Sequence, residues 1–134
     1  MKRKFLWLGF AAITIGLFVL IYHGPGRAVL RGHVGDVAAA MLVYATIGAL
    51  SPQTWIRFRA FTTFAFATLI EFGQSFWSAG SVLGELTIGD TFDPWDILAY
   101  AIGVVICVAC ELCWRSQDVR ASAVAPSPQC ASSP

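Results

Sequence analysis

Four long stretches of the sequence are almost entirely apolar, and glycine, proline or charged residues separate them. The first runs unbroken from Phe5 to Tyr22 and stops at the turn Gly24-Pro25-Gly26. At about 1.5 Å per helical residue, such runs approach the length needed to cross a bilayer core. The pattern therefore predicts an all-α chain, an antiparallel bundle of four transmembrane helices. The predicted helices cover residues 5–23, 34–51, 60–79 and 95–114 of a transmembrane domain at 1–115.

Composition agrees with a membrane location. Of the 134 residues, 57% are hydrophobic and only 13% are charged, with a mean hydropathy of +0.67. A soluble domain of this length needs more charge to cover its surface. The net charge of +1 gives no basic excess that would favour nucleic acid as a partner. The last stretch, residues 116–134, is small, polar and proline-containing, and it predicts a disordered tail.

The distribution of basic residues predicts the orientation. Seven Lys and Arg residues fall on one side of the four predicted helices, and only Arg27 and Arg31 fall on the other. The positive-inside rule then places both termini in the cytoplasm of a multi-pass inner-membrane protein. A cleaved signal peptide is the alternative for the first run, but that run is long and no small-x-small cleavage site follows it. The seven are Lys2, Arg3, Lys4, Arg57, Arg59, Arg115 and Arg120.

The third apolar run contains TLIEFGQSFWSAG, in which Glu71 and Gln74 stand one turn apart. Glu71 is eight residues before the predicted outer end at Ala79, or about 12 Å deep. A carboxylate facing lipid is costly, so Glu71 is expected to point into the bundle or a water-filled cleft. Tyr44 is at the same calculated depth and is a candidate hydrogen-bond partner for Glu71.

These residues belong to a set of polar groups in the outer half of the predicted bundle. Because acidic groups need counter-charges, the basic residues of the first outer loop are included, with Arg31 as the candidate partner of Glu71. Other interpretations stay open: a protonated Glu71, hydrogen-bonding between helices, and Asp36 and Asp96 as helix N-caps. The predicted ligand-binding set is Arg27, Arg31, Asp36, Tyr44, Glu71, Gln74, Asp96 and Tyr100, with His33 as a third outer cation.

No cofactor or metal is expected from the sequence. Cys107, Cys110 and Cys113 have the spacing C-x2-C-x2-C, but within one helix the third position rotates away from the first. They are predicted to be small packing residues. His23 and His33 form only a weak metal signal. Glu111 is expected to pair with Arg115 at i,i+4.

The motifs RGHVGDVAAAMLVY, IEFGQSFW and LTIGDTFDPWDILAYAIG resemble an uncharacterised family of small bacterial four-helix membrane proteins, which is similar to the VanZ-like proteins. The resemblance covers about residues 5–114. Its most specific parts are Glu-x-x-Gln at Glu71 and Gln74, and Asp-x-x-x-Tyr-x-x-Gly at Asp96, Tyr100 and Gly103. This chain lacks the Arg that VanZ-like proteins usually have between the Gln and the Asp, and it has Tyr100 where they usually have Asn. The resemblance implies a role in the cell envelope, and the VanZ prototype is linked to glycopeptide-antibiotic resistance.

Two functions from different classes follow. The first is an outward-facing site that binds a lipid head group, a cell-wall precursor or a small amphiphile. The alternative is a small proton-coupled transporter or exporter subunit, although small multidrug exporters carry their membrane Glu in the first helix. No Ser-His-Asp set or metal motif favours an enzyme. A homodimer is left open.

Overall fold

The computed structural model describes residues 1–78 and 94–124, and every regular element in these two ranges is helical. Three of the helices are long and apolar enough to cross a membrane, at Lys2–Ile21, Leu30–Leu50 and Trp95–Ser122. The fourth long helix carries Arg57, Arg59 and Glu71 and is not among the three. The long helices are α1 (Lys2–Ile21), α3 (Gly35–Leu50), α4 (Ile56–Ser78) and α6 (Pro94–Val124); α2 (Arg27–Val29) and the π-helical turn η1 (Leu30–Val34) connect α1 to α3.

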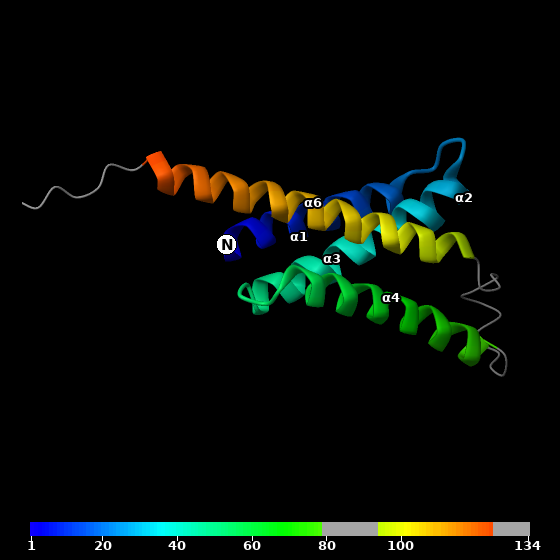
Figure 1. Cartoon of the computed structure of the whole chain (residues 1–134). Helices are drawn as coiled ribbons and strands as arrows, with labels where there is room; N and C mark the ends of the chain where they lie inside the picture. Colours follow the sequence, from blue (N-terminus) through cyan, green and yellow to red (C-terminus); the bar gives the residue numbers. More distant parts are fainter. Residues whose placement is uncertain (79–93, 125–134) are drawn as a thin grey trace, which may run out of the picture.

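Helix α3 is the centre of the arrangement, because it packs against α1, α4 and α6. Figure 1 shows that the chain reverses direction from α1 to α3, from α3 to α4 and again from α4 to α6. Two of the reversals have a local cause. Gly26 adopts a left-handed φ of 79°, which favours glycine, and the α3–α4 turn contains Pro52, which disfavours helix at Ser51. As a consequence α3 and α6 run in the same direction side by side.

Small residues allow α3 and α6 to approach closely. A Cβ added to Gly103 of α6 would lie 2.8 Å from the Val37 carbonyl oxygen and 3.0 Å from the Ala40 Cβ, both on α3. Packing of this kind replaces the hydrophobic effect as the force between helices in lipid. The main core lies where α1, α3 and α6 meet, and its buried members are Phe5, Leu8, Ala12, Met41, Tyr44, Ala45 and Cys107.

Large apolar side chains cover the outside of the helices. Trp7 is 71% exposed and Phe61 is also 71% exposed, and both project away from the core. Leu69 and Phe72 of α4 are exposed as well, so the apolar face of that helix is the outer one. A surface of this kind suits lipid and not water. The expected membrane protein is thus supported by the described residues.

Two helix boundaries differ most from the sequence prediction. α4 begins at Ile56 instead of residue 60, which brings Arg59 into its first turn. α6 continues to Val124 instead of ending at residue 114, so the first part of the predicted tail is helical. Its Ala and Arg residues have high helix propensity, and the Lys4 ammonium holds the Asp118 carboxylate at 2.6 Å. The rest of the predicted tail, 125–134, lies outside the described residues.

Candidate functional site

Two groups of polar side chains lie at opposite ends of the described helices. The first, which we call the Arg59 network, consists of Tyr44, Arg59, Glu111 and Arg115. The Arg59 and Glu111 side chains are fully buried and form an ion pair through Nη1 and Oε2. The Tyr44 hydroxyl donates to the same oxygen over 2.7 Å. Arg115 donates to the other oxygen, Oε1, from Nε at 3.1 Å and from Nη2 at 2.8 Å.

Arg59 also fixes the turn between α3 and α4. Its Nη2 donates to the carbonyl oxygens of Ser51 and Thr54, each at 3.1 Å. The guanidinium carbon lies 4.6 Å from the centre of the Phe5 ring, a cation–π distance. One arginine therefore links α1, the α3–α4 turn and α6. Its bonds to backbone carbonyls and to a buried carboxylate indicate a structural role.

The second group, which we call the acidic cluster, consists of His33, Asp36, Glu71, Asp96 and Tyr100. Its centre is the Tyr100 hydroxyl of α6. That oxygen lies 3.1 Å from Glu71 Oε2 of α4 and 3.4 Å from Asp36 Oδ1 of α3. A phenol has one proton, so it can donate to only one of these two carboxylates at a time. The hydroxyl therefore connects α3, α4 and α6 at this end of the helices.

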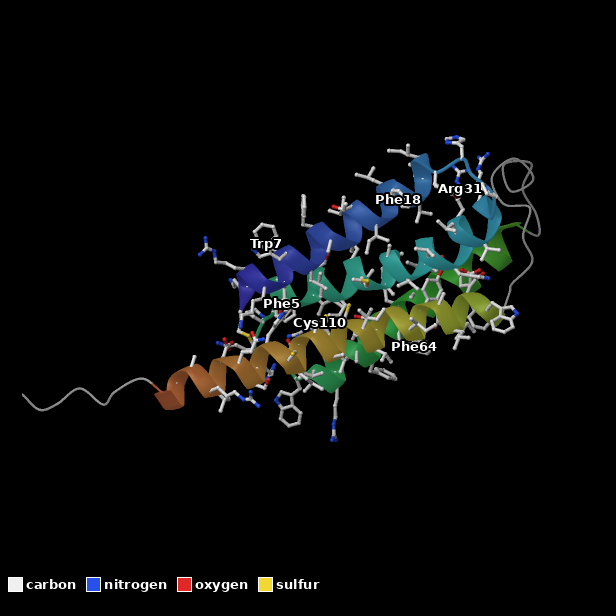
Figure 2. The ribbon with its side chains drawn as sticks, turned by 90° about the horizontal axis from the view of Figure 1, so that it is seen from above. Phe5, Trp7, Phe18, Arg31, Phe64 and Cys110 are labelled. Carbon is white, nitrogen blue, oxygen red and sulfur yellow. The ribbon has the colours of Figure 1, made fainter. Side chains whose placement is uncertain are left out.

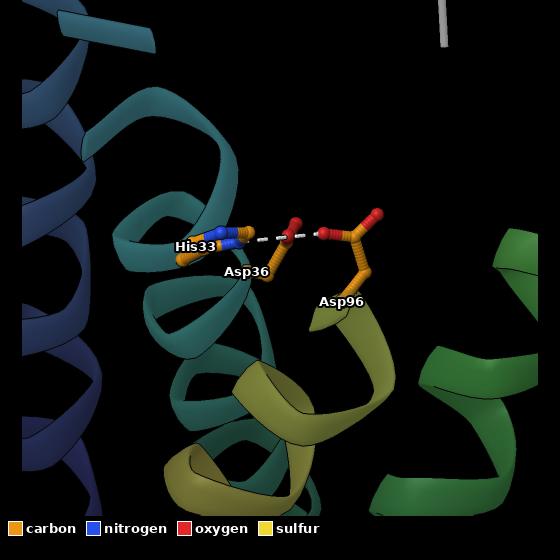
Figure 3. A group of neighbouring side chains, drawn as sticks. All are labelled: His33, Asp36 and Asp96. Atoms are coloured by element: carbon orange, nitrogen blue, oxygen red, sulfur yellow. Dashed lines mark ion pairs between the residues drawn. The ribbon is translucent and has the colours of Figure 1, made fainter. Parts of the chain in front are cut away.

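His33 and Asp96 complete the acidic cluster. Figure 3 shows the His33 ring from η1, the Asp36 carboxylate from α3 and the Asp96 carboxylate from α6 converging on one point. His33 Nδ1 is 3.6 Å from Asp96 Oδ1. Because α3 and α6 run in parallel, their first turns lie at the same end, and this places Asp36 beside Asp96. Three carboxylates from three helices thus meet with one histidine.

The comparisons with known proteins give a family and no function. A family model described as "Protein of unknown function (DUF2809)" matches residues 26–104, more than half of the chain. The chain belongs to the DUF2809 family. No curated protein and no solved structure matches it. The matched residues contain the whole acidic cluster. Glu111 and Arg115 of the Arg59 network lie beyond them.

In this DUF2809 protein four members of the predicted ligand set come together, Glu71 among them. Asp36, Glu71 and Tyr100 are joined by the hydrogen bonds given above, and Asp96 lies beside them through His33. The Gln74 backbone belongs to α4, but its side chain lies outside the described residues. Glu85, Asp90 and Asp93, between α4 and α6 in the sequence, also lie outside the described residues.

Arg31 and Tyr44 make different contacts from the predicted ones. Arg31 of η1 lies beside the C-terminal end of α1 (Figure 2), is exposed, and donates from Nη2 to the Leu20 carbonyl at 3.3 Å. In the part of the chain that the structure describes, no ion pair joins Arg31 to Asp36 or Asp96. Arg27 is also exposed. Tyr44 directs its only proton to Glu111, so the predicted bond to Glu71 is replaced by one at the other end of the protein.

Sequence reasoning missed the connection between Arg59 and Glu111. It assigned Arg59 to a cytoplasmic loop and Glu111 to an i,i+4 pair with Arg115. The second assignment is confirmed by the ion pair at 2.8 Å. The sequence did contain a signal for the Arg59–Glu111 pair. Glu111 stands in an apolar helix, and a buried carboxylate requires a partner at the same level.

Proposed function

We propose that this DUF2809 protein is a four-span antiparallel inner-membrane protein whose acidic cluster binds the amine of an envelope lipid head group or a similar amphiphile. The observation that carries the proposal is the gathering of three carboxylates, Asp36, Glu71 and Asp96, around Tyr100 and His33. A primary ammonium group has three donors and one positive charge. Its charge and its donors are complementary to these three carboxylates.

The proposed topology has both termini in the cytoplasm. The excess of basic residues at the end that holds the Arg59 network supports it. With α4 as the fourth span, the acidic cluster opens on the outer side of the membrane. Resemblance to bacterial VanZ-like membrane proteins supports a role in the cell envelope, which is where such head groups and cell-wall precursors are found.

The basic residues near this end favour a zwitterionic ligand. Arg27 and Arg31 lie on α2 and η1, the same connection that carries His33, and both guanidinium groups are exposed. Arginine binds phosphate oxygens with two parallel hydrogen bonds. A phosphoethanolamine head group would place its ammonium in the acidic cluster and its phosphate toward these arginines. An anionic head group without an amine would place no positive charge beside the carboxylates.

Proton-coupled transport is the second candidate. One observation favours it: Asp36, Glu71 and Tyr100 form a continuous hydrogen-bonded chain between three helices. Carboxyl groups in such chains exchange protons in pumps and transporters. Uptake or efflux by reconstituted vesicles, driven by a pH gradient, would support this candidate over a binding protein.

Native mass spectrometry of the purified protein with defined lipids tests the proposal. We expect phosphatidylethanolamine to be retained more strongly than phosphatidylcholine, whose quaternary amine cannot donate, and than phosphatidylglycerol, which has no amine. Glu71→Gln should weaken phosphatidylethanolamine retention about 10- to 100-fold, the equivalent of one charge-assisted hydrogen bond.

Asp118→Asn is the matched control. It also neutralises a carboxylate, but that carboxylate is on the surface and pairs with Lys4 near the Arg59 network. This variant should retain phosphatidylethanolamine as the wild type does. Equal retention of the three lipids by the wild-type protein would refute the proposed function.

A further inference from the structure

His33, Asp36 and Asp96 lie together in a way that the proposed binding of an amine does not explain. Each offers one ligand atom, and these three atoms all lie within 4.8 Å of one another. The His33–Asp96 separation of 3.6 Å is close to the edge of about 3.3 Å for a tetrahedron with metal–ligand bonds of about 2.0–2.1 Å. From these contacts we infer that His33 Nδ1, Asp36 and Asp96 bind a divalent transition-metal ion.

The imidazole nitrogen provides an independent reason. His33 Nδ1 is inaccessible to solvent and has no hydrogen-bond partner. Its distance to Asp96 Oδ1 is too long for a hydrogen bond. A buried polar atom without a partner is rare in folded proteins and is commonly explained by an ion or a water molecule. Figure 3 shows this nitrogen facing the two carboxylates, which is where the ion would lie.

The three ligands come from η1, α3 and α6. His33 and Asp36 are three residues apart, so they share one face of the helical path that η1 and α3 form. Asp96 comes from the first turn of α6, which lies parallel to α3. The His33 side chain is 42% exposed and that of Asp96 is 20% exposed, so an ion can enter from solvent. Three protein ligands leave at least one coordination position for water or for a ligand oxygen.

The donor atoms indicate the class of metal. One imidazole nitrogen and two carboxylate oxygens suit Zn²⁺ and Mn²⁺, whereas Ca²⁺ and Mg²⁺ prefer oxygen ligands alone. The two aspartates neutralise the charge of a divalent ion. The four cysteines of the chain could bind Zn²⁺ on their own, but Mn²⁺ has little affinity for thiolates. Mn²⁺ is therefore the better probe of this site.

The test is a Mn²⁺ titration of the full chain, purified in detergent without a polyhistidine tag and stripped with a chelator. Electron paramagnetic resonance measures the free ion. The wild-type protein is expected to bind Mn²⁺ saturably with one ion per chain. His33→Ala and Asp96→Asn should each weaken binding at least about 100-fold, because loss of an outer-shell partner alone costs about 10- to 100-fold.

His23→Ala is the matched control, since His23 is an exposed histidine of the same connection outside the cluster. It should leave the Mn²⁺ affinity unchanged. A measurement without mutation gives a second answer: bound Mn²⁺ should protect His33 from acylation by diethyl pyrocarbonate while His23 reacts. Absence of saturable Mn²⁺ binding by the wild type, or binding that survives both ligand variants, would overturn the inference.

This inference shares Asp36 and Asp96 with the proposed function, but the two can fail separately. A wild-type protein that binds Mn²⁺ but retains the three lipids equally would refute only the proposed function. One that prefers phosphatidylethanolamine but does not bind Mn²⁺ would refute only the metal site. In that case the 3.6 Å contact between His33 and Asp96 is an ion pair and nothing more.

Discussion

Tyr44 and Glu111 meet inside the protein although they are 67 residues apart in the sequence, and the Tyr44 hydroxyl donates to Glu111 Oε2 over 2.7 Å. The same oxygen accepts from Arg59, so α3, α4 and α6 are joined at one atom. A charged group buried in this way is stable only while all its partners are present. The Arg59 network is therefore the part of the structure where a single substitution has the largest expected effect.

Glu111→Ala should destabilise the protein strongly. It leaves the fully buried Arg59 guanidinium without its carboxylate, and breaking a buried ion pair costs about 3–5 kcal/mol. Thermal unfolding in detergent, followed by tryptophan fluorescence, measures the loss. Arg57→Ala is the control, because Arg57 is an exposed arginine two residues before Arg59. It should change the stability by no more than about 0.5 kcal/mol. Equal effects of the two variants would contradict the structural role of the network.

Gly103→Ala tests the close approach of α3 and α6. The new methyl group would lie 2.8 Å from the Val37 carbonyl, which is backbone and cannot move aside without shifting a helix. Overpacking of this kind costs about 1–3 kcal/mol. Gly16→Ala is the matched control: a Cβ there meets nothing within 4 Å, and alanine is favoured over glycine within a helix by about 0.5–1 kcal/mol. The unfolding temperature should fall for the first and stay or rise for the second.

The proposed topology can be measured with reporters fused after Gly26 and after Gln53. Gly26 follows α1 and Gln53 follows α3, so the two sites lie at opposite ends of the helices. Alkaline phosphatase should be active after Gly26, and green fluorescent protein should fluoresce after Gln53. Phosphatase activity after Gln53 would reverse the orientation and place the acidic cluster in the cytoplasm.

Much of the fold could be predicted because hydropathy and helix-breaking residues determine where long helices lie. Apolar runs ending at Gly24-Pro25-Gly26 and Ser51-Pro52 gave the ends of α1 and α3 closely. The start of α4 was harder to predict, because Arg57 and Arg59 look like residues of a loop. Arg59 is buried in the first turn of this helix, where Glu111, distant in sequence, compensates its charge.

The acidic cluster was partly predictable for a similar reason. Its carboxylates are conspicuous in apolar helices, but their relative depth depends on where each helix begins. The predicted depth of Tyr44 takes Asp36 as the outer end of its helix, whereas the helical span already begins at Leu30, about 9 Å further out. Asp36 therefore lies level with Glu71, and Tyr44 lies too deep to reach it. Tyr100, instead of Tyr44 or Arg31, connects the two carboxylates.

The last prediction concerns the coupling of Glu71 to its neighbours. If the Tyr100 hydroxyl and the Glu71 carboxylate act as one unit, removing either should destroy the same interaction. Glu71→Gln and Tyr100→Phe should then each reduce phosphatidylethanolamine retention, and the double variant should be little worse than either single one. Contacting residues of this kind show interaction energies of about 0.5–3 kcal/mol in a double-mutant cycle.

Arg31→Ala provides the contrasting cycle. Arg31 donates to the Leu20 carbonyl and is exposed, so its contribution would be to the phosphate of the head group and independent of Glu71. The effects of Glu71→Gln and Arg31→Ala should therefore add, within about 0.3–0.5 kcal/mol. Circular dichroism of every variant checks that the helices are intact. Additivity between Glu71 and Tyr100, or strong coupling between Glu71 and Arg31, would show that the head group is bound by a different arrangement from the one proposed. The reason is that a double-mutant cycle gives an interaction energy only for groups that share a partner.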